Sequence, residues 1–278
     1  MSVASNPNPM TLISVPQPSG GFSWTQAPWG FTLTCAGLPA RHAFTAADLQ
    51  LRNDEREWRQ VAAFLDVPPE RLLLVRQVHG TSVAMARSGH ISSWDRPEAD
   101  IILSDDPGVA IGVRVADCAP VLLLDERSGA VGAVHAGWRG AAARAVEAAV
   151  RRMEEEFGSR PEDLIAAIGP CLGQCCGEVG PDVVQAFRAG GADDDDVGRW
   201  FAPGAGDRWM LDLAGANRDQ LIASGLRRDR VFDSGLCTKT WHQRFHSYRA
   251  AGTQAGRMLA AIRPSRELQT GGLALRER

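Results

Sequence analysis

Three short segments of the sequence place a metal-binding side chain next to residues that favour tight turns. His79 stands before Gly80 at the end of a β-rich run. Cys118 follows Asp117 between two apolar runs, and His135 ends a further apolar run. Two imidazoles and one thiolate suit Zn²⁺, and three protein ligands would leave its fourth position open to water or substrate. The residue types therefore predict a zinc site on these two histidines and this cysteine.

Each of these residues also has an ordinary structural interpretation. His79 suits a surface turn, Cys118 suits a small buried apolar position, and His135 could cap a helix. Asp117 could orient a metal ligand or transfer a proton, but it could equally stabilise its own turn. A cysteine and a histidine at neighbouring strand ends are also the parts of a cysteine hydrolase, with Cys118 as the nucleophile and His135 as its base.

The elements that must position these residues alternate along the chain. Apolar runs predict strands or β-rich segments at residues 71–78, 99–103, 109–115, 119–124, 130–134 and 164–168. Helical spacing predicts helices at residues 55–65, 141–157, 181–189, 212–224 and 248–262, and residues 190–206 are predicted as a loop. This order predicts an α/β (α+β) layered sandwich of mixed β-sheets flanked by helices. Strand ends lie on one rim of a sheet, so we expect the three segments to converge there.

The composition excludes several classes of protein. The 30 basic and 33 acidic residues give a net charge of −3, which indicates neither nucleic acid nor an anionic membrane as a partner. No apolar run is long enough to cross a bilayer. Six cysteines in 278 residues favour thiols or metal ligands in a reducing cytoplasm over a disulfide framework. We expect a cytoplasmic monomer or small homo-oligomer.

We expect a single catalytic domain over residues 41–265. Residues 1–40 would hold a flexible N-terminal tail and the leading strands, and residues 266–278 would form a C-terminal tail.

Four motifs stand in the order and spacing of one known family. They are Gln77-Val78-His79-Gly80, Ala116-Asp117-Cys118-Ala119-Pro120, His135-Ala136-Gly137-Trp138-Arg139-Gly140 and Ile168-Gly169-Pro170. On these motifs the chain resembles the YfiH/laccase-domain family, which is also labelled multicopper polyphenol oxidase and purine nucleoside phosphorylase. The resemblance covers most of the chain from about His42 to Ile262.

The resemblance implies a catalytic Zn²⁺ held by His79, Cys118 and His135. It implies phosphorolysis of adenosine, inosine, guanosine and methylthioadenosine by inorganic phosphate, with adenosine deamination as a companion activity. It also implies a fold shared with certain cysteine-hydrolase toxins, in which mixed sheets lie between helices.

Further candidates lie in or beside the matched motifs. Beside Cys118, the catalytic candidates are Asp117 and Arg139, and the substrate-binding candidates are Arg76, Gln77, Trp138 and Arg249. A planar guanidinium suits phosphate, and Arg139 follows His135 by only four residues. Arg76 and Arg249 could equally pair with carboxylates, and the indole of Trp138 could stack on a base or simply pack.

The sequence departs from the family pattern at two places. The family usually carries an arginine where Ala46 and Ala47 stand, and an aromatic residue where Gly177 precedes Glu178. A pocket without these contacts could have lost catalysis, so a non-catalytic metal-binding protein is one alternative. A Cys-His hydrolase that acts on cell-wall precursors is another.

The copper label of the family fits this chain poorly. A multicopper oxidase needs about ten histidines, many of them in His-x-His pairs. The chain has six histidines and no such pair. We therefore expect zinc rather than copper, and no blue absorbance.

Overall fold

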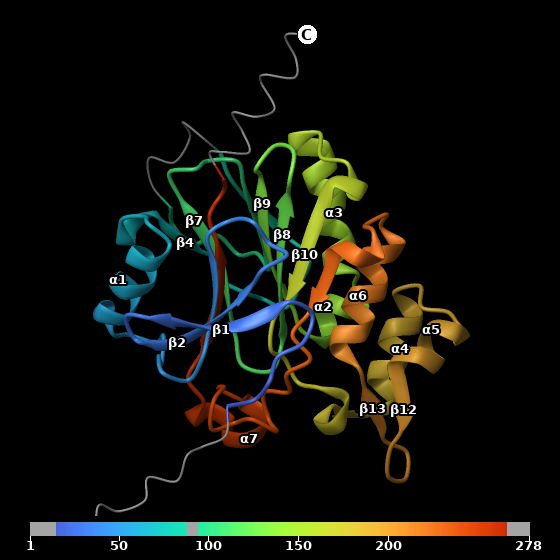
Figure 1. Cartoon of the computed structure of the whole chain (residues 1–278). Coiled ribbons are helices and arrows are strands. Elements are labelled where there is room, and N and C mark those ends of the chain that lie inside the picture. Colours follow the sequence, from blue (N-terminus) through green and yellow to red (C-terminus); the bar gives the residue numbers. More distant parts are fainter. Residues whose placement is uncertain (1–14, 88–93, 266–278) are drawn as a thin grey trace, which may run out of the picture.

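The computed structural model describes residues 15–87 and 94–265, and it consists of two six-stranded sheets between layers of helices (Figure 1). The predicted C-terminal tail and the first 14 residues of the predicted N-terminal tail lie outside the described residues. Among the described residues, no helix is long and apolar enough to cross a membrane.

Both large sheets are mixed, as predicted. In spatial order the first sheet contains β1 (Phe22–Ala27), β2 (Gly30–Cys35), β3 (His42–Thr45), β15 (Met258–Ile262), β7 (Ala110–Val115) and β4 (Leu72–Leu74). The second contains β14 (Val231–Asp233), β10 (Leu164–Ile168), β8 (Ala119–Asp125), β9 (Val131–Ala136), β6 (Ile101–Ser104) and β5 (Val83–Ala86). The edge pairs β4–β7, β10–β14 and β5–β6 are parallel, and the other pairs are antiparallel.

The main apolar core fills the space between the two sheets. Phe44 and Ile111 of the first sheet belong to the same buried cluster as Leu122 and Ile165 of the second. Every residue of β8 and β9 is buried, because the first sheet covers one face of these strands and helices cover the other. This explains why both strands are continuous apolar runs rather than alternating ones.

Helices cover the outer faces. On the first sheet, Val61 of α1 (Glu55–Phe64) packs in one cluster with Leu74 and Leu259. On the second sheet lie α2 (Trp138–Ala142), α3 (Ala145–Phe157) and α6 (Leu213–Ala223), and Val150 of α3 shares a cluster with Leu103 of β6. Beyond them lie α4 (Pro181–Ala189), α5 (Asp194–Trp200) and a small sheet of β11 (Glu178–Val179), β13 (Trp209–Leu211) and β12 (Phe201–Pro203) (Figure 1).

The prediction of one helix over residues 141–157 is wrong, because the chain breaks at Arg144. This residue has a left-handed φ of 60° between α2 and α3. Its guanidinium donates to the carbonyls of Gly190 and Gly191, the latter at 2.8 Å, and pairs with Glu147. The bend therefore ties the helix pair to the end of α4.

The predicted loop over residues 190–206 is also wrong. Asp193 caps α5, since its carboxylate accepts the backbone N–H of Asp196 at 2.8 Å and the Asp196 side chain accepts from Asp193 in return. A run of aspartates in the first turn favours a helix N-terminus, where it meets the positive end of the helix dipole. The run of four aspartates is thus a helix start rather than a solvated loop.

The predicted helix over residues 248–262 divides into a short helix and a central strand. Helix α7 (Tyr248–Ala251) ends at Gly252, whose φ of 55° stops helical propagation. β15 then lies between β3 and β7 and pairs with both. Pairing on both sides outweighs the helical preference of its alanine-rich sequence.

Candidate functional site

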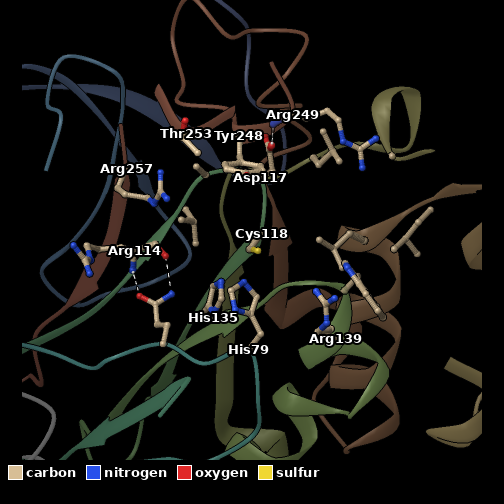
Figure 2. A pocket seen from close by; sticks show the side chains of 18 of the residues that line it. His79, Arg114, Asp117, Cys118, His135, Arg139, Tyr248, Arg249, Thr253 and Arg257 are labelled. Atoms are coloured by element: carbon tan, nitrogen blue, oxygen red, sulfur yellow. Dashed lines mark hydrogen bonds between the residues drawn. The ribbon is translucent and has the colours of Figure 1, made fainter. Parts of the chain in front are cut away.

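Two of the connections that cross between the sheets carry His79 and Cys118. His79 lies between β4 of the first sheet and β5 of the second, and Cys118 lies between β7 of the first and β8 of the second. His135 lies near the end of β9. The expectation that the three segments meet on one rim of a single sheet is therefore wrong, because they meet where two sheets join (Figure 2).

The three side chains, hereafter the metal trio, converge as the sequence predicts. The potential ligand atoms of His79, Cys118 and His135 all lie within 4.8 Å of one another. The two imidazole rings meet edge to face with centroids 4.8 Å apart. His135 is buried, Cys118 is half-buried and His79 is exposed, so an ion bound here would be reached from one side.

Asp100 holds two members of the trio in place, and the sequence analysis missed it. Its side chain is fully buried and accepts from the backbone N–H groups of Val78, His79 and Gly80 at 3.2, 2.9 and 2.6 Å. The same carboxylate accepts from Nδ1 of His135 at 2.7 Å. A carboxylate behind a ligating histidine fixes its tautomer and orientation. The available signal was an acidic residue inside the apolar run that predicts a strand at residues 99–103.

Left-handed backbone at two residues turns the crossing connections toward the site. His79 has φ of 62° and Asp117 has φ of 87°, a region that costs energy for residues other than glycine. Asp100 anchors the first turn. Asp117 fixes the second itself, since it accepts from Thr238 Oγ1 at 2.6 Å and from the backbone N–H of Arg249 at 2.5 Å. Asp117 is thus placed to hold the neighbouring loops, and the carboxylate that contacts His135 is Asp100.

The electrostatics of the trio favour a thiolate. Burial alone would raise the pKa of Cys118, but hydrogen bonds and positive charge from His135 and His79 lower it to about 6. Burial alone would lower the pKa of His135, but its bonds with Asp100 and Cys118 raise it to about 9. Without a metal, the site therefore holds a thiolate beside an imidazolium near neutral pH.

The surroundings of the trio leave room for an ion. Gly137 begins α2 directly after β9, with an ordinary φ of −69°. A Cβ at this position would lie 2.7 Å from Cys118 Sγ and 3.5 Å from His79 Cδ2. Glycine at residue 137 therefore keeps a space beside the trio that any side chain would fill. The donor set of two nitrogens and one sulfur fits Zn²⁺.

A pocket of about 880 Å³ opens onto the trio. The predicted residues that line it are Arg76, Gln77, Asp117, Trp138, Arg139 and Arg249. The structure therefore gathers every predicted site residue around one cavity. A cavity of this size holds a nucleoside-sized ligand.

Several predicted substrate contacts already have protein partners. Arg76 pairs with Glu98 at 2.9 Å, and Arg249 donates to the carbonyls of Cys176 and Glu178. Gln77 exchanges two hydrogen bonds with the backbone of Arg114, at 2.7 and 2.9 Å. Gln77 therefore positions the pocket wall.

Trp138 and Arg139 form a stacked pair at the pocket wall. The guanidinium carbon of Arg139 lies 4.2 Å from the ring centroid of Trp138. Among residues 15–87 and 94–265, Arg139 has no carboxylate partner. It thus offers a positive charge to a ligand.

The sequence analysis missed a second group of cations across the pocket. Arg114, Arg257 and Arg52 line it, and Figure 2 shows Arg114 and Arg257 on the opposite side of the metal trio from Arg139. Burial and the like charges of Arg96 and Arg257 lower the pKa of Arg114. No carboxylate pairs with Arg114 in the part of the chain that the structure describes. An anion bound in the pocket would neutralise the charge of Arg114.

The two departures from the family pattern have different structural settings. Ala46 is buried, and Ala47 donates its N–H to the carbonyl of Arg244. At Gly177, a Cβ would lie 2.4 Å from the carbonyl oxygen of Leu211. A side chain at residue 177 therefore requires a different backbone path at this part of the pocket rim.

Comparisons with known proteins agree with this geometry. A family model described as "Multi-copper polyphenol oxidoreductase laccase" matches residues 45–264. A protein named purine nucleoside phosphorylase from Deinococcus radiodurans is 37% identical over 253 residues, which cover 88% of this chain and 92% of that protein. Adenosine deaminase RL5, from an unknown prokaryotic organism, is 34% identical over 73% of this chain and 78% of its own length.

The solved structures include one of YlmD from Geobacillus stearothermophilus. It superposes with a TM-score of 0.77 at 26% identity and covers 89% of this chain and 99% of that chain. The metal trio, the layered fold and these matches agree, and the chain belongs to the multi-copper polyphenol oxidoreductase laccase family, the family of the YfiH and YlmD purine nucleoside phosphorylases.

Proposed function

We propose that this chain is a zinc-dependent purine nucleoside phosphorylase that also deaminates adenosine. Its proposed substrates are inorganic phosphate with adenosine, inosine, guanosine or methylthioadenosine. The observation that carries the proposal is the open metal trio at a pocket with cations on two sides. The relatives named purine nucleoside phosphorylase and adenosine deaminase support the two reactions.

His79, Cys118 and His135 would hold the zinc ion, and Asp100 prepares His135 for this role. Because Nδ1 of His135 donates to Asp100, Nε2 is the nitrogen that would face the metal, once it has released the proton that it carries in the metal-free imidazolium. When bound, Zn²⁺ supplies Lewis acidity and lowers the pKa of water, which is the chemistry that deamination needs.

Phosphorolysis requires the phosphate to be held next to the sugar. A phosphate oxygen bonds to the sugar carbon C1′ while the bond to the purine nitrogen breaks, and the purine takes that electron pair and a proton. Arg139 is our first candidate for contacting the phosphate, and Arg114 with Arg257 forms the second. Paired guanidinium groups suit a multiply charged anion because each can donate two parallel hydrogen bonds. Trp138 would pack against the base.

A panel of adenosine, inosine, guanosine and methylthioadenosine, each with and without phosphate, tests the proposal. Base release that requires phosphate supports the phosphorylase, and ammonia from adenosine alone supports the deaminase. Loss of both in Cys118→Ala is expected. If the zinc-loaded protein turned over none of these substrates, a non-catalytic metal-binding protein would be favoured instead. The missing family arginine at Ala46 and Ala47 is the reason for that alternative.

One observation also favours a cysteine hydrolase as a second candidate. Asp100, His135 and Cys118 form a relay in which the carboxylate orients the imidazole and the imidazole lowers the pKa of the thiol. A thiol alkylator separates the two functions. Labelling of Cys118 only after chelation supports zinc ligation, whereas rapid labelling of metal-loaded protein supports the nucleophile.

A further inference from the structure

Three cysteines gather outside the pocket, at a place that the proposed reaction does not use. Cys175 and Cys176 lie on the single helical turn Gln174–Cys176, and Cys237 lies after β14. We call these three residues the cysteine cluster. Only Cys237 is buried, while Cys175 is exposed and Cys176 is half-buried.

Backbone pairing fixes the two segments beside each other. Cys171 and Cys237 form a parallel bridge between segments that are far apart in sequence. The N–H of Cys171 donates to Leu236 at 3.3 Å, and the N–H of Thr238 donates back to Cys171 at 2.9 Å. The cluster is therefore built by the fold and does not depend on a flexible loop.

The sulfur spacing matches the edge length of a metal–thiolate polyhedron. All three Sγ atoms lie within 4.8 Å of one another, and those of Cys175 and Cys176 are 3.8 Å apart. Zinc–sulfur bonds of about 2.3 Å separate two sulfurs by about 3.8 Å in a tetrahedron and by about 4.0 Å in a trigonal plane. One ion can therefore contact all three sulfurs after small side-chain movements.

Thr240 places hydrogen-bonding groups next to all three sulfur atoms. Burial raises the pKa of the Cys175 thiol, so a metal ion has to displace its proton. The backbone N–H of Thr240 donates to Cys237 Sγ at 3.5 Å. The hydroxyl of Thr240 lies 3.4 Å from Cys175 Sγ and 3.6 Å from Cys176 Sγ. Hydrogen bonds to ligating sulfurs disperse their negative charge and stabilise the bound state. A Cβ at Gly173 would approach Cys237 Cβ to 3.0 Å, so glycine leaves the space beside the sulfurs free.

We propose that the cysteine cluster is a second metal site, which binds one thiophilic d¹⁰ ion through three thiolates. Its ligand set contains no imidazole, so it is softer than the metal trio and suits Zn²⁺ or Cu⁺. The exposed edge at Cys175 leaves a further position open to solvent or a small ligand. Each thiol releases its proton on binding, so up to three protons leave for each ion bound.

Cadmium titration tests this site separately from the pocket. The protein is the reduced, metal-stripped Cys118→Ala variant, in which the metal trio has lost its thiolate. We expect a near-ultraviolet sulfur-to-cadmium absorbance that saturates at one equivalent with an intensity of three thiolates. Zn²⁺ and, under a reductant, Cu⁺ are then added in separate arms, and the ion that displaces cadmium with the smaller excess is the preferred ligand.

Two further variants make the test specific. Adding Cys175→Ser and Cys176→Ser, which change exposed or half-exposed positions, is expected to remove the saturable absorbance while circular dichroism remains unchanged. The matched control is Cys35→Ser, since Cys35 is a buried cysteine of β2 in the other sheet, and it is expected to leave the absorbance intact. A missing band in Cys118→Ala, or the same band in the double-serine protein, would overturn the proposal. So would a reduced cluster that binds no cadmium and instead forms a disulfide in air.

Discussion

Replacing Asp100 by asparagine removes the charge behind the metal trio while keeping the side-chain shape. Oδ1 accepts from His79 N and His135 Nδ1, and Oδ2 accepts from Val78 N and Gly80 N. The asparagine oxygen can replace one of these acceptors, and its NH₂ group then faces two donors. Two donors therefore lose their acceptor, and of the four only His135 Nδ1 is fully buried.

The expected losses follow from this count. A fully buried donor left unsatisfied costs about 1–3 kcal/mol, and a part-buried donor costs less because water can reach it, so the free energy of unfolding should fall by about 1–3 kcal/mol. Loss of the carboxylate behind a ligating histidine lowers metal affinity by about 10- to 100-fold. In the wild type, burial alone would raise the pKa of Asp100, but the bonds from His135 and the backbone lower it. The stability that the ionised Asp100 carboxylate contributes to the wild type is therefore lost as the pH falls through its lowered pKa.

Zinc affinity is measured by competition with a chromophoric chelator, and stability by urea unfolding. Both assays use Cys175→Ser, Cys176→Ser protein so that the pocket alone is titrated. Asp125→Asn is the matched control, because Asp125 is equally buried, accepts from Ser128 and Ser159, and lies at the far end of β8. The control should lose stability but keep zinc affinity. Wild-type zinc affinity in Asp100→Asn would refute the reasoning.

Three further predictions address the pocket. Gly137→Ala should weaken zinc binding, because the new Cβ would lie 2.7 Å from Cys118 Sγ. Gly198→Ala is the control and should leave zinc affinity unchanged, because a Cβ at residue 198 has no atom within 4 Å. Equal zinc affinities of the two variants would contradict the prediction. In metal-stripped protein, the rate of alkylation of Cys118 should rise with pH through a midpoint near pH 6. The stability that the Cys118–His135 ion pair contributes should be lost as the pH falls through about 6. An alkylation midpoint near pH 9 would contradict the lowered pKa of Cys118. Arg114→Gln and Arg139→Gln should each raise the KM for phosphate by about 10-fold or more, since a charged hydrogen bond contributes about 1.5–3 kcal/mol. A residue whose loss leaves that KM unchanged does not contact phosphate.

The sequence predicted the structure best where buried strands end in turn residues. Apolar runs around His79, Cys118 and His135 predicted the strands and the convergence of these three side chains, since burial on both faces makes such runs continuous. It did not reveal that His79 and Cys118 lie on crossings between two sheets. Sheet membership depends on long-range pairing, which leaves no local pattern in the sequence.

Two residues that line or support the site and that the sequence did not indicate share one signal, a charge within or directly before a buried strand. Asp100 directly precedes β6, and Arg114 is the half-buried member of the otherwise buried β7. A buried charge needs a compensating partner or function. The partner cannot be read from sequence, because Asp100 faces backbone groups at residues 78–80 and a histidine on another strand.

The error at residues 248–262 has a different cause. The composition of the segment favours a helix, but Gly252 ends α7 and β15 is held by hydrogen bonds to β3 and β7. Tertiary pairing decides such a segment.

Zinc reconstitution tests the central claim most directly. Metal-stripped Cys175→Ser, Cys176→Ser protein is titrated with Zn²⁺ while base release from inosine is measured with and without phosphate. The account predicts release that requires phosphate, rises in proportion to zinc and stops rising at one equivalent. Full base release by the metal-stripped protein, or none at one equivalent of zinc, would contradict it.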